Sequence, residues 1–320
     1  MKDHGLISNI LLILRHLGIT GLIRAIYFAV LTGIARKIGI KKIKTRIFDY
    51  EMYLDTSDKG LSRTLFLFGR REIDHYKMIQ EIVKPGMNVL DIGANIGYYA
   101  IMESRLVGET GRITAIEPML ANIEMLQKNI ELNSAENITV IHAAVSEATG
   151  TGNMYVSTHS NLHTFHRDGS AFDSLDSTPI EVGTLTLKDA AEKAGASPEL
   201  IRMDVEGHEV EILRQLIKLV NEKIMSPQVI FETHLSRYIN SNSFDSVLQS
   251  LFNLGYTVRM AASSNKSGTE RLNALGYKNG TPFYSDFGER AIFREIKNDH
   301  AIDLICNTGG LRTVLLTKTI

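Results

Sequence analysis

Three scarcities in the sequence exclude whole classes of protein. Cys306 is the only cysteine in 320 residues, so an internal disulfide and a cysteine-based metal site are both excluded. The 35 Lys and Arg nearly balance the 36 Asp and Glu, and a net charge of −1 lacks the positive excess of nucleic-acid-binding proteins. No internal repeat or low-complexity tract occurs. We therefore expect a globular cytoplasmic protein that does not bind nucleic acid.

Long uninterrupted apolar runs are also missing, even in the apolar N-terminal region. Arg15 and His16 interrupt the first run and Arg24 the second, so a membrane-spanning helix and a signal peptide are both poor descriptions. Residues 1–50 carry nine Lys and Arg against two Asp. We predict that residues 1–46 form a basic extension of two amphipathic helices. These helices either pack on the main domain or rest on an anionic membrane as a peripheral contact.

From residue 47 onward, short apolar strands alternate with helical stretches, a pattern typical of βαβ units. After a strand at 47–56, we expect seven strands at 87–93, 112–118, 138–146, 200–207, 228–234, 256–262 and 312–318. The fold class is therefore α/β, with a Rossmann-like, doubly wound, mostly parallel sheet of seven strands. Residues 47–320 form the main domain, with its core at about 47–260. Residues 261–320 elaborate it, and 263–311 lack periodicity and are expected to be a loop.

The segment VLDIGANIGYYA joins the first of these seven strands to the helix after it and has the composition of a nucleotide-binding turn. It reads D-x-G-x-N-x-G rather than the nicotinamide pattern G-x-G-x-x-G. The carboxylate of Asp91 would repel a pyrophosphate but attract the ammonium group of S-adenosylmethionine. We therefore predict that this loop binds S-adenosylmethionine, with an NAD(P)-dependent oxidoreductase as the alternative. The loop residues assigned to the cofactor are Asp91, Gly93, Ala94, Asn95 and Gly97.

Two further strand ends complete the predicted cofactor site. The second strand ends in Glu117 and Pro118, where a carboxylate can accept both ribose hydroxyls. The third ends near Ala143 and Ala144, whose small side chains suit a flat adenine ring. Glu117 discriminates little between the two cofactor classes, because NAD enzymes also place an acid there.

At this point the chain resembles the FkbM family of methyltransferases. The resemblance rests on VKPGMNVLDIGANIGYYA (83–100), LIRMDVEGHEVEIL (200–213) and VIFETH (229–234), and it covers about residues 47–260. It implies a class I methyltransferase fold and S-adenosylmethionine as cofactor. It also implies O-methylation of a hydroxyl on a sugar, a lipid-linked sugar or a natural-product scaffold.

Polar residues at the ends of the fourth and fifth strands form the candidate catalytic cluster. Strand ends of an open α/β sheet meet at one crevice, and alternate residues of a strand share a face. We predict His234 as the general base, since histidine titrates near neutral pH. Glu232 would orient it, Asp204 and Glu206 would position the acceptor, and His208 is a second candidate base. Asp204 also belongs to the predicted cofactor site, and capping of the following helix is an alternative role for Glu206 and Glu209.

We expect no metal site, because the spacing of these acids and histidines matches no known metal pattern. Asp, Glu and His nevertheless suit Mg²⁺ or Mn²⁺, and the segment HSNLHTFHRD brings His159, His163 and His166 together, so a zinc site there is a minor alternative. A non-catalytic module that only binds S-adenosylmethionine remains a further alternative. The sequence names neither the acceptor nor the oligomeric state.

Overall fold

The computed structural model describes residues 6–157, 162–166, 178–238, 243–278, 280, 282–285 and 288–318. Within the first helix, the side chains of residues 6–13 and 15–17 lie outside this description. The sequence prediction for His159 also falls outside the described residues.

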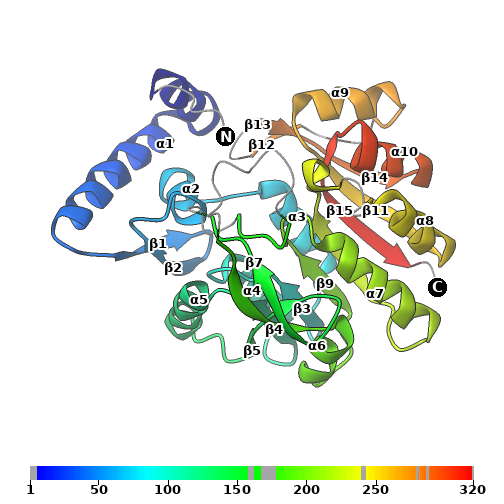
Figure 1. Ribbon diagram of the computed structural model, residues 1–320. Coiled ribbons are helices and arrows are strands. Elements are labelled where there is room, and N and C mark those ends of the chain that lie inside the picture. Colours follow the sequence, from blue (N-terminus) through cyan, green and yellow to red (C-terminus); the bar gives the residue numbers. More distant parts are fainter. Residues whose placement is uncertain are drawn as a thin grey trace.

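A sheet of eight strands forms the centre of the molecule (Figure 1). Its order is β14-β11-β15-β10-β9-β3-β4-β5, and the strands are β3 (Asn88–Ile92), β4 (Arg112–Glu117), β5 (Ile138–His142), β9 (Leu200–Met203), β10 (Gln228–Glu232), β11 (Tyr256–Ser263), β14 (Ile292–Ile296) and β15 (Leu311–Lys318). The five strands from β5 to β10 are parallel, whereas β15 is antiparallel to both β10 and β11. The predicted Rossmann-like, mostly parallel sheet is confirmed, with β14 as an additional edge strand.

Alternate residues of the central strands enter two separate cores. Leu90 and Ile92 of β3 pack with the helices of one face, whereas Val89 packs with those of the other. One face is covered by α6 (Leu187–Lys193), α7 (Glu209–Asn221) and α8 (Asp245–Asn253), and the other by α3 (Ile73–Ile82), α4 (Tyr98–Val107) and α5 (Leu120–Leu132). Burial on both faces explains why these strands are almost continuously apolar.

The strand expected at 47–56 is present as β2 (Tyr50–Asp55), but the strand that precedes it was not expected. That strand, β1 (Lys42–Ile47), pairs with β2 around Phe48 and Asp49 and crosses the expected boundary at residue 46. The expected loop at 263–311 is largely structured. Its elements are α9 (Lys266–Ala274), β12 (Phe283–Ser285), β13 (Gly288–Arg290), β14, α10 (Asn298–Ile302) and a π-helical turn at Asp303–Asn307. Most of these are five residues or shorter, too short for a periodic pattern to show.

A small sheet stands at the carboxyl ends of the central strands. It contains β6 (Ala144–Val145), β8 (Ile180–Leu185) and β7 (Gly150–Met154), in that order. The pairing of β7 with β8 is antiparallel. Beyond β7, Tyr155 forms an antiparallel bridge with Thr164.

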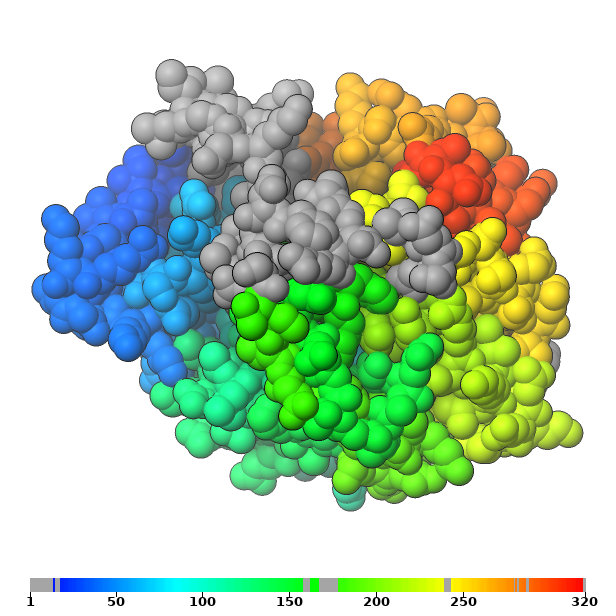
Figure 2. Space-filling model, viewed as in Figure 1, coloured from blue at the N-terminus to red at the C-terminus, as the bar shows by residue number. Residues whose placement is uncertain are grey.

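The N-terminal helix α1 (Leu6–Lys37) lies along one edge of the molecule (Figures 1 and 2). Non-helical angles at Gly18 divide it into two helical segments, as the predicted pair of helices requires. The second segment packs on α2 (Leu61–Phe68), where the rings of Phe28 and Phe66 lie 5.2 Å apart between centroids. The stretch Gly18–Lys37 is long and apolar enough to cross a membrane, and 28% of it is buried in the molecule.

Candidate active site

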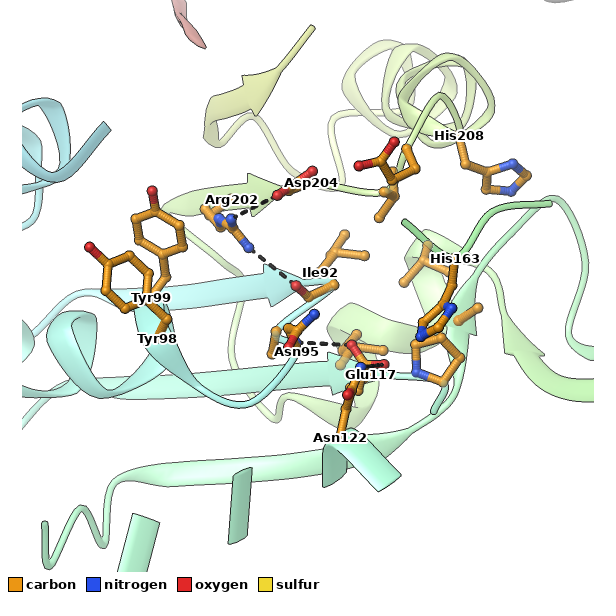
Figure 3. Close-up of a pocket in the computed structure, with 18 of the residues that line it drawn as sticks. Ile92, Asn95, Tyr98, Tyr99, Glu117, Asn122, His163, Arg202, Asp204 and His208 are labelled. Atoms are coloured by element: carbon orange, nitrogen blue, oxygen red, sulfur yellow. Dashed lines mark hydrogen bonds and ion pairs between the residues drawn. The ribbon is translucent and has the colours of Figure 1, made fainter. Parts of the chain in front are cut away.

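A cavity opens beyond the carboxyl ends of β3, β4 and β9, where ligands bind in open α/β sheets (Figure 3). The empty space within it measures about 820 Å³, a figure that includes open solvent at its mouth. Of the residues predicted for the cofactor, those that line the cavity are Gly93, Ala94, Asn95, Glu117, Pro118, Ala143, Ala144 and Asp204. The turn after β3, the end of β4 and the start of β6 thus form one wall.

Close backbone approach shapes the turn after β3. A Cβ atom on Gly93, whose φ is +80°, would lie 2.4 Å from the carbonyl oxygen of Asp204. No side chain fits in that space, so the end of β9 presses directly on the turn. Asn95 also has a positive φ, 50°, which a non-glycine residue adopts at some cost in free energy. Gly97 caps α4 with φ +90° and is not part of the cavity wall.

Glu117 lies at the floor of this wall with only 4% of its surface exposed. Its carboxylate accepts hydrogen bonds from the backbone N–H groups of Asn95 at 2.9 Å and Met119 at 3.0 Å, and from the side-chain amide of Asn122 at 3.0 Å (Figure 3). Burial raises the pKa of Glu117 to about 7, although these three donors oppose the rise. A carboxylate has about four acceptor sites, so capacity remains for a ligand hydroxyl.

Asp91 lies elsewhere than we predicted. It is fully buried, it is not among the cavity-lining residues, and its Oδ1 accepts a hydrogen bond from Arg202 Nη1 at 3.0 Å. Arg202 stands directly opposite Asp91 in the pairing of β3 with β9. The same guanidinium lies 3.6 Å from Asp204 and covers the ring of Tyr99 at 4.2 Å. The expectation of direct cofactor contact therefore needs correction, since Asp91 pairs with Arg202, which lines the cavity.

A second group of acids surrounds one imidazole where β9 and β10 end. His234 Nε2 lies 3.7 Å from Asp204, 3.7 Å from Glu206 and 3.8 Å from Glu232. On the other side of the ring, Nδ1 lies 3.1 Å from Glu209 Oε1. We call Asp204, Glu206, Glu209, Glu232 and His234 the acceptor cluster. Four of these were predicted to converge, and Glu209 joins them in addition to its expected place in the first turn of α7.

Electrostatics in the acceptor cluster alter the role expected for His234. Burial alone would lower the pKa of His234, but the charges of Glu206 and Glu209 outweigh burial and raise it well above its ordinary value. A protonated imidazole has no free lone pair, so His234 is not prepared to act as the general base. Burial raises the pKa of Glu206 to about 7 and that of Glu232 to about 8. Glu206 also lines the cavity and has a positive φ of 51°.

His208 does not join the acceptor cluster. Its imidazole is turned away from Asp204 (Figure 3), with Nε2 3.1 Å from Ser146 Oγ and Nδ1 3.2 Å from His166 Nε2. It lines the far wall of the cavity together with His163 and Phe165, and burial lowers its pKa to about 4. The role of second base beside His234 is therefore not supported by this placement.

Several residues of the site were missed by sequence reasoning. Glu72 is 1% exposed and accepts a hydrogen bond from Tyr99, and Arg312 of β15 pairs with Glu72 at 3.1 Å and with Glu232 at 2.6 Å. The additional cavity-lining residues include Arg71, Glu72, Tyr98, Tyr99, Asn122 and Arg202. Of these residues, only Arg202 could have been predicted from the sequence. It stands two residues before Asp204 in the strand predicted at 200–207, and alternate residues of a strand share a face.

Comparison with known proteins gives one family match and several partial likenesses. The family model described as the methyltransferase FkbM domain matches residues 91–258, more than half of the chain. Protein-L-isoaspartate O-methyltransferase of Methanococcoides burtonii is 32% identical over 19% of this chain and 30% of its own length. Ribosomal RNA small subunit methyltransferase G of Streptomyces avermitilis is 31% identical over 25% and 33%. The chain thus spans about a third of these relatives. The structure of M. jannaschii TYW2 in complex with AdoMet has a TM-score of 0.40 at 14% identity, covering 80% of this chain and 87% of that one.

Proposed function

The chain belongs to the FkbM methyltransferase domain family, and from that premise we propose that it methylates a hydroxyl oxygen on a sugar, a lipid-linked glycan or a natural product. The methyl donor of the family is S-adenosyl-L-methionine. One observation carries the choice of acceptor, namely the group of four carboxylates around His234 beside the cavity. Carboxylates accept hydrogen bonds from vicinal hydroxyls, and one of them can take the proton that O-methylation releases.

The residues of the cavity fit this cofactor. Glu117 is buried beside small residues at the end of β4, where its remaining acceptor capacity suits a ribose. Ala143 and Ala144 leave room for a flat base on the adjacent wall. The side of Asp204 toward the turn after β3 presents a negative charge and so suits an ammonium group.

When bound, S-adenosylmethionine supplies an electrophilic methyl group. The chain must hold the acceptor oxygen in line with that group and remove its proton. Glu206 and Asp204 both line the cavity and lie 3.7 Å from His234. Glu206 is the better placed to receive the proton, because burial raises its pKa to about 7 whereas Asp204 lies 3.6 Å from Arg202. His234 would then hold the carboxylates at fixed distances with its positive charge, and Glu232, anchored by Arg312, would accept a second hydroxyl of the acceptor.

The membrane contact considered for residues 1–46 remains a proposal, and the exposed surface of α1 supports it. Large apolar side chains there are more than half exposed: Ile19, Ile23, Ile26, Tyr27, Val30, Ile34 and Ile38. Exposed basic residues follow directly, among them Arg36, Lys37, Lys41 and Lys44. Apolar side chains beside positive charge fit an anionic bilayer. Because the opposite side of α1 packs on α2, we propose that it lies on a cytoplasmic membrane surface rather than crossing it.

Labelled methyl transfer into fractionated extract of the source organism tests the reaction. The purified chain is incubated with methyl-labelled S-adenosylmethionine and with separate lipid and carbohydrate, protein, and RNA fractions. We expect label in the lipid and carbohydrate fraction, with loss of the label on mild glycan release. Label only in protein or RNA, the acceptors named in the partial relatives, would overturn the acceptor class. Binding of S-adenosylhomocysteine without transfer into any fraction would indicate a module that binds but does not catalyse.

Flotation with liposomes tests the membrane contact. Wild-type protein should float with vesicles of phosphatidylglycerol and phosphatidylcholine, less so with phosphatidylcholine alone. The double variant Ile23→Glu and Tyr27→Glu changes two exposed side chains and should stay in the dense fraction. A matched pair on the exposed surface of α5, Ala121→Glu and Gln127→Glu, also adds two negative charges and so controls for charge alone. Flotation of the α1 variant equal to wild type would rule out this surface.

A further inference from the structure

A second group of metal-ligating atoms converges outside the acceptor cluster. His208 Nδ1 lies 3.2 Å from His166 Nε2 and 3.5 Å from Glu211 Oε2, and His166 Nε2 lies 3.6 Å from Glu211 Oε1. His166 comes from the segment that bridges to Tyr155, whereas His208 and Glu211 flank the start of α7. Residues 42 and 45 positions apart in the chain therefore place one ligand atom each within 4.8 Å of the other two.

These distances match one face of a tetrahedral metal site. With metal–ligand bonds of about 2.0–2.1 Å, two ligand atoms of a tetrahedron are separated by about 3.3–3.4 Å. The two imidazole nitrogens and the carboxylate already stand at 3.2, 3.5 and 3.6 Å. A small rotation of the Glu211 carboxylate would present a single oxygen to an ion between them.

Hydrogen bonding within the described residues leaves this group incompletely satisfied. Glu211 Oε2 is buried and has no hydrogen-bond partner there, although a buried carboxylate oxygen normally has one. His208 is 6% exposed and its Nε2 lies beside Ser146 Oγ. If Nε2 carries the proton of a neutral ring, Nδ1 directs a lone pair at His166 and Glu211. In this tautomer His166 Nε2 can donate a hydrogen to that nitrogen. With the proton of His166 on Nδ1 instead, three electron-pair donors face one another, and a bound cation satisfies them.

We propose that His166, His208 and Glu211 bind one divalent transition-metal ion, with zinc as the preferred ion. Two imidazoles and one carboxylate are a ligand set that zinc takes with water in the fourth position. His166 is 21% exposed at its side chain, whereas His208 is 7% exposed, so the ion and its water would enter from the side of His166. The proposal departs from our expectation of no metal site, and it groups His166 with α7 rather than with the histidines of its own segment.

The surroundings of the two histidines fit the outer shell of such a site. Metal-bound histidines usually have their other ring nitrogen held by a polar partner. Ser146 Oγ holds the Nε2 of His208, and Arg237 Nη1 donates to the backbone carbonyl of His166 at 3.2 Å. Thr164 Oγ1 further ties the segment to the backbone of Glu206 at 2.9 Å. Because His208 also lines the cofactor cavity, the ion would anchor that wall.

Asp204, Glu206 and His234 form the other group within ligand distance among the described residues. There, however, the imidazole of His234 lies amid four carboxylates and itself supplies positive charge. His166, His208 and Glu211 have one carboxylate and a hydrogen-bonded pair of rings, and two nitrogen ligands favour a transition metal over Mg²⁺. We therefore expect Zn²⁺ to bind at His166, His208 and Glu211 rather than at Asp204, Glu206 and His234.

Metal titration of the full-length, tag-free chain tests the proposal. After chelator treatment and its removal, Zn²⁺ is titrated by calorimetry, and Co²⁺ is titrated by visible absorption. We expect one equivalent of Zn²⁺ and the intense absorption of four-coordinate Co²⁺. His166→Ala and Glu211→Gln should each weaken Zn²⁺ binding by more than ~100-fold, beyond the 10–100-fold loss that an outer-shell change causes.

Two control variants keep the result specific. His300→Ala removes a histidine that pairs with Tyr277 far from the site, and Glu206→Gln changes the acceptor cluster; both should retain the Zn²⁺ equivalent. Absence of Zn²⁺ binding by the wild type overturns the proposal without any variant. Binding that persists in His166→Ala and Glu211→Gln, or that is lost in Glu206→Gln instead, also overturns it. Circular dichroism checks that each variant is folded, and His166→Gln replaces His166→Ala if the latter is not.

Discussion

The two halves of the cavity rim are built on opposite principles. On the side of β3 and β4, small residues and backbone set the shape, and the one acid, Glu117, accepts three hydrogen bonds of 2.9–3.0 Å. On the side of β9 and β10, three carboxylates stand 3.7–3.8 Å from His234 Nε2, too far for hydrogen bonds, and that nitrogen has no hydrogen-bond partner among the described residues. In the first half the polar side chain is already held by hydrogen bonds within the protein. In the second half, polar groups remain available to bind an incoming acceptor.

If the second half carries the chemistry, the largest effect should come from Glu206→Gln. The variant keeps size and polarity but no longer accepts a proton, so we expect kcat for methyl transfer to fall by about 10²–10⁴-fold. Affinity for S-adenosylhomocysteine should change little, because Glu117 and the turn after β3 remain intact. Turnover with labelled donor and a calorimetric titration measure the two quantities separately.

Glu147→Gln is the matched control, since Glu147 is exposed near the small sheet. It should leave both quantities unchanged. A Glu206→Gln variant with wild-type turnover would move the proton acceptor to another group, with Glu232 next.

Asp91 pairs with Arg202 and does not line the cavity. Its replacement should therefore affect the stability of the fold more than cofactor binding. Asp91→Asn leaves Arg202 buried without its full countercharge, and breaking such a buried pair typically costs about 3–5 kcal/mol of the free energy of unfolding. Urea denaturation measures that loss. Affinity for S-adenosylhomocysteine should fall by less than about tenfold, because Asp91 does not line the cavity. Wild-type stability with abolished binding would restore the direct contact expected from the sequence.

The difference between the halves also explains how far the sequence could be interpreted. The binding half follows from local pattern, since Gly93, Asn95 and Glu117 stand at fixed places relative to their strands, and all three are found at the cavity. The acceptor half depends on contacts between distant segments. Arg312 meets Glu232 only because β15 inserts beside β10, and no local periodicity reveals that neighbour.

Protonation was equally hidden from the sequence. Histidine at a strand end predicts a base near neutral pH. In the structure burial would lower the pKa of His234, yet the charges of Glu206 and Glu209 raise it well above its ordinary value. Glu209 looked like a helix cap, and nothing in the spacing indicates that its side chain turns back to His234 at 3.1 Å. The order of strands and helices predicted for the core was confirmed. The short elements between residues 263 and 311 and the β1–β2 hairpin were not predicted from the sequence.

Glu117→Gln tests the binding half directly and should have a moderate effect. The amide of Gln would direct an N–H toward one of the three donors that Glu117 accepts from. Hydrogen bonds to a charged group contribute about 1.5–3 kcal/mol, so we expect the Kd for S-adenosylhomocysteine to rise by roughly 10–100-fold. Calorimetry measures it, with the exposed Glu136→Gln as control. An unchanged Kd would place the ribose elsewhere in the cavity.

The smallest effect near pH 7 is expected from replacement of His75. This histidine is fully buried against Tyr99, with ring centroids 4.5 Å apart, and neither ring nitrogen has a hydrogen-bond partner among the described residues. Burial, with Arg202 adding to it, lowers its pKa to about 3. The unfolded chain therefore takes up this proton first, near pH 6.5. The contribution of a neutral His75 is fully present above that pH and is lost as pH falls toward 3.

His75→Phe keeps a ring against Tyr99 and cannot take up a proton, so at pH 7 its free energy of unfolding should lie within about 1.5 kcal/mol of wild type, as for other size-conserving core changes. Below pH 6.5 the variant should gain on wild type by up to about 1.4 kcal/mol per pH unit. Urea denaturation of both proteins from pH 7.5 to 5 measures the difference, in which contributions of the other titrating groups cancel to first order. A difference that stays constant over this range would mean that His75 is hydrated or already charged in the folded protein, and the packing behind the rim would then be looser than the structure has it.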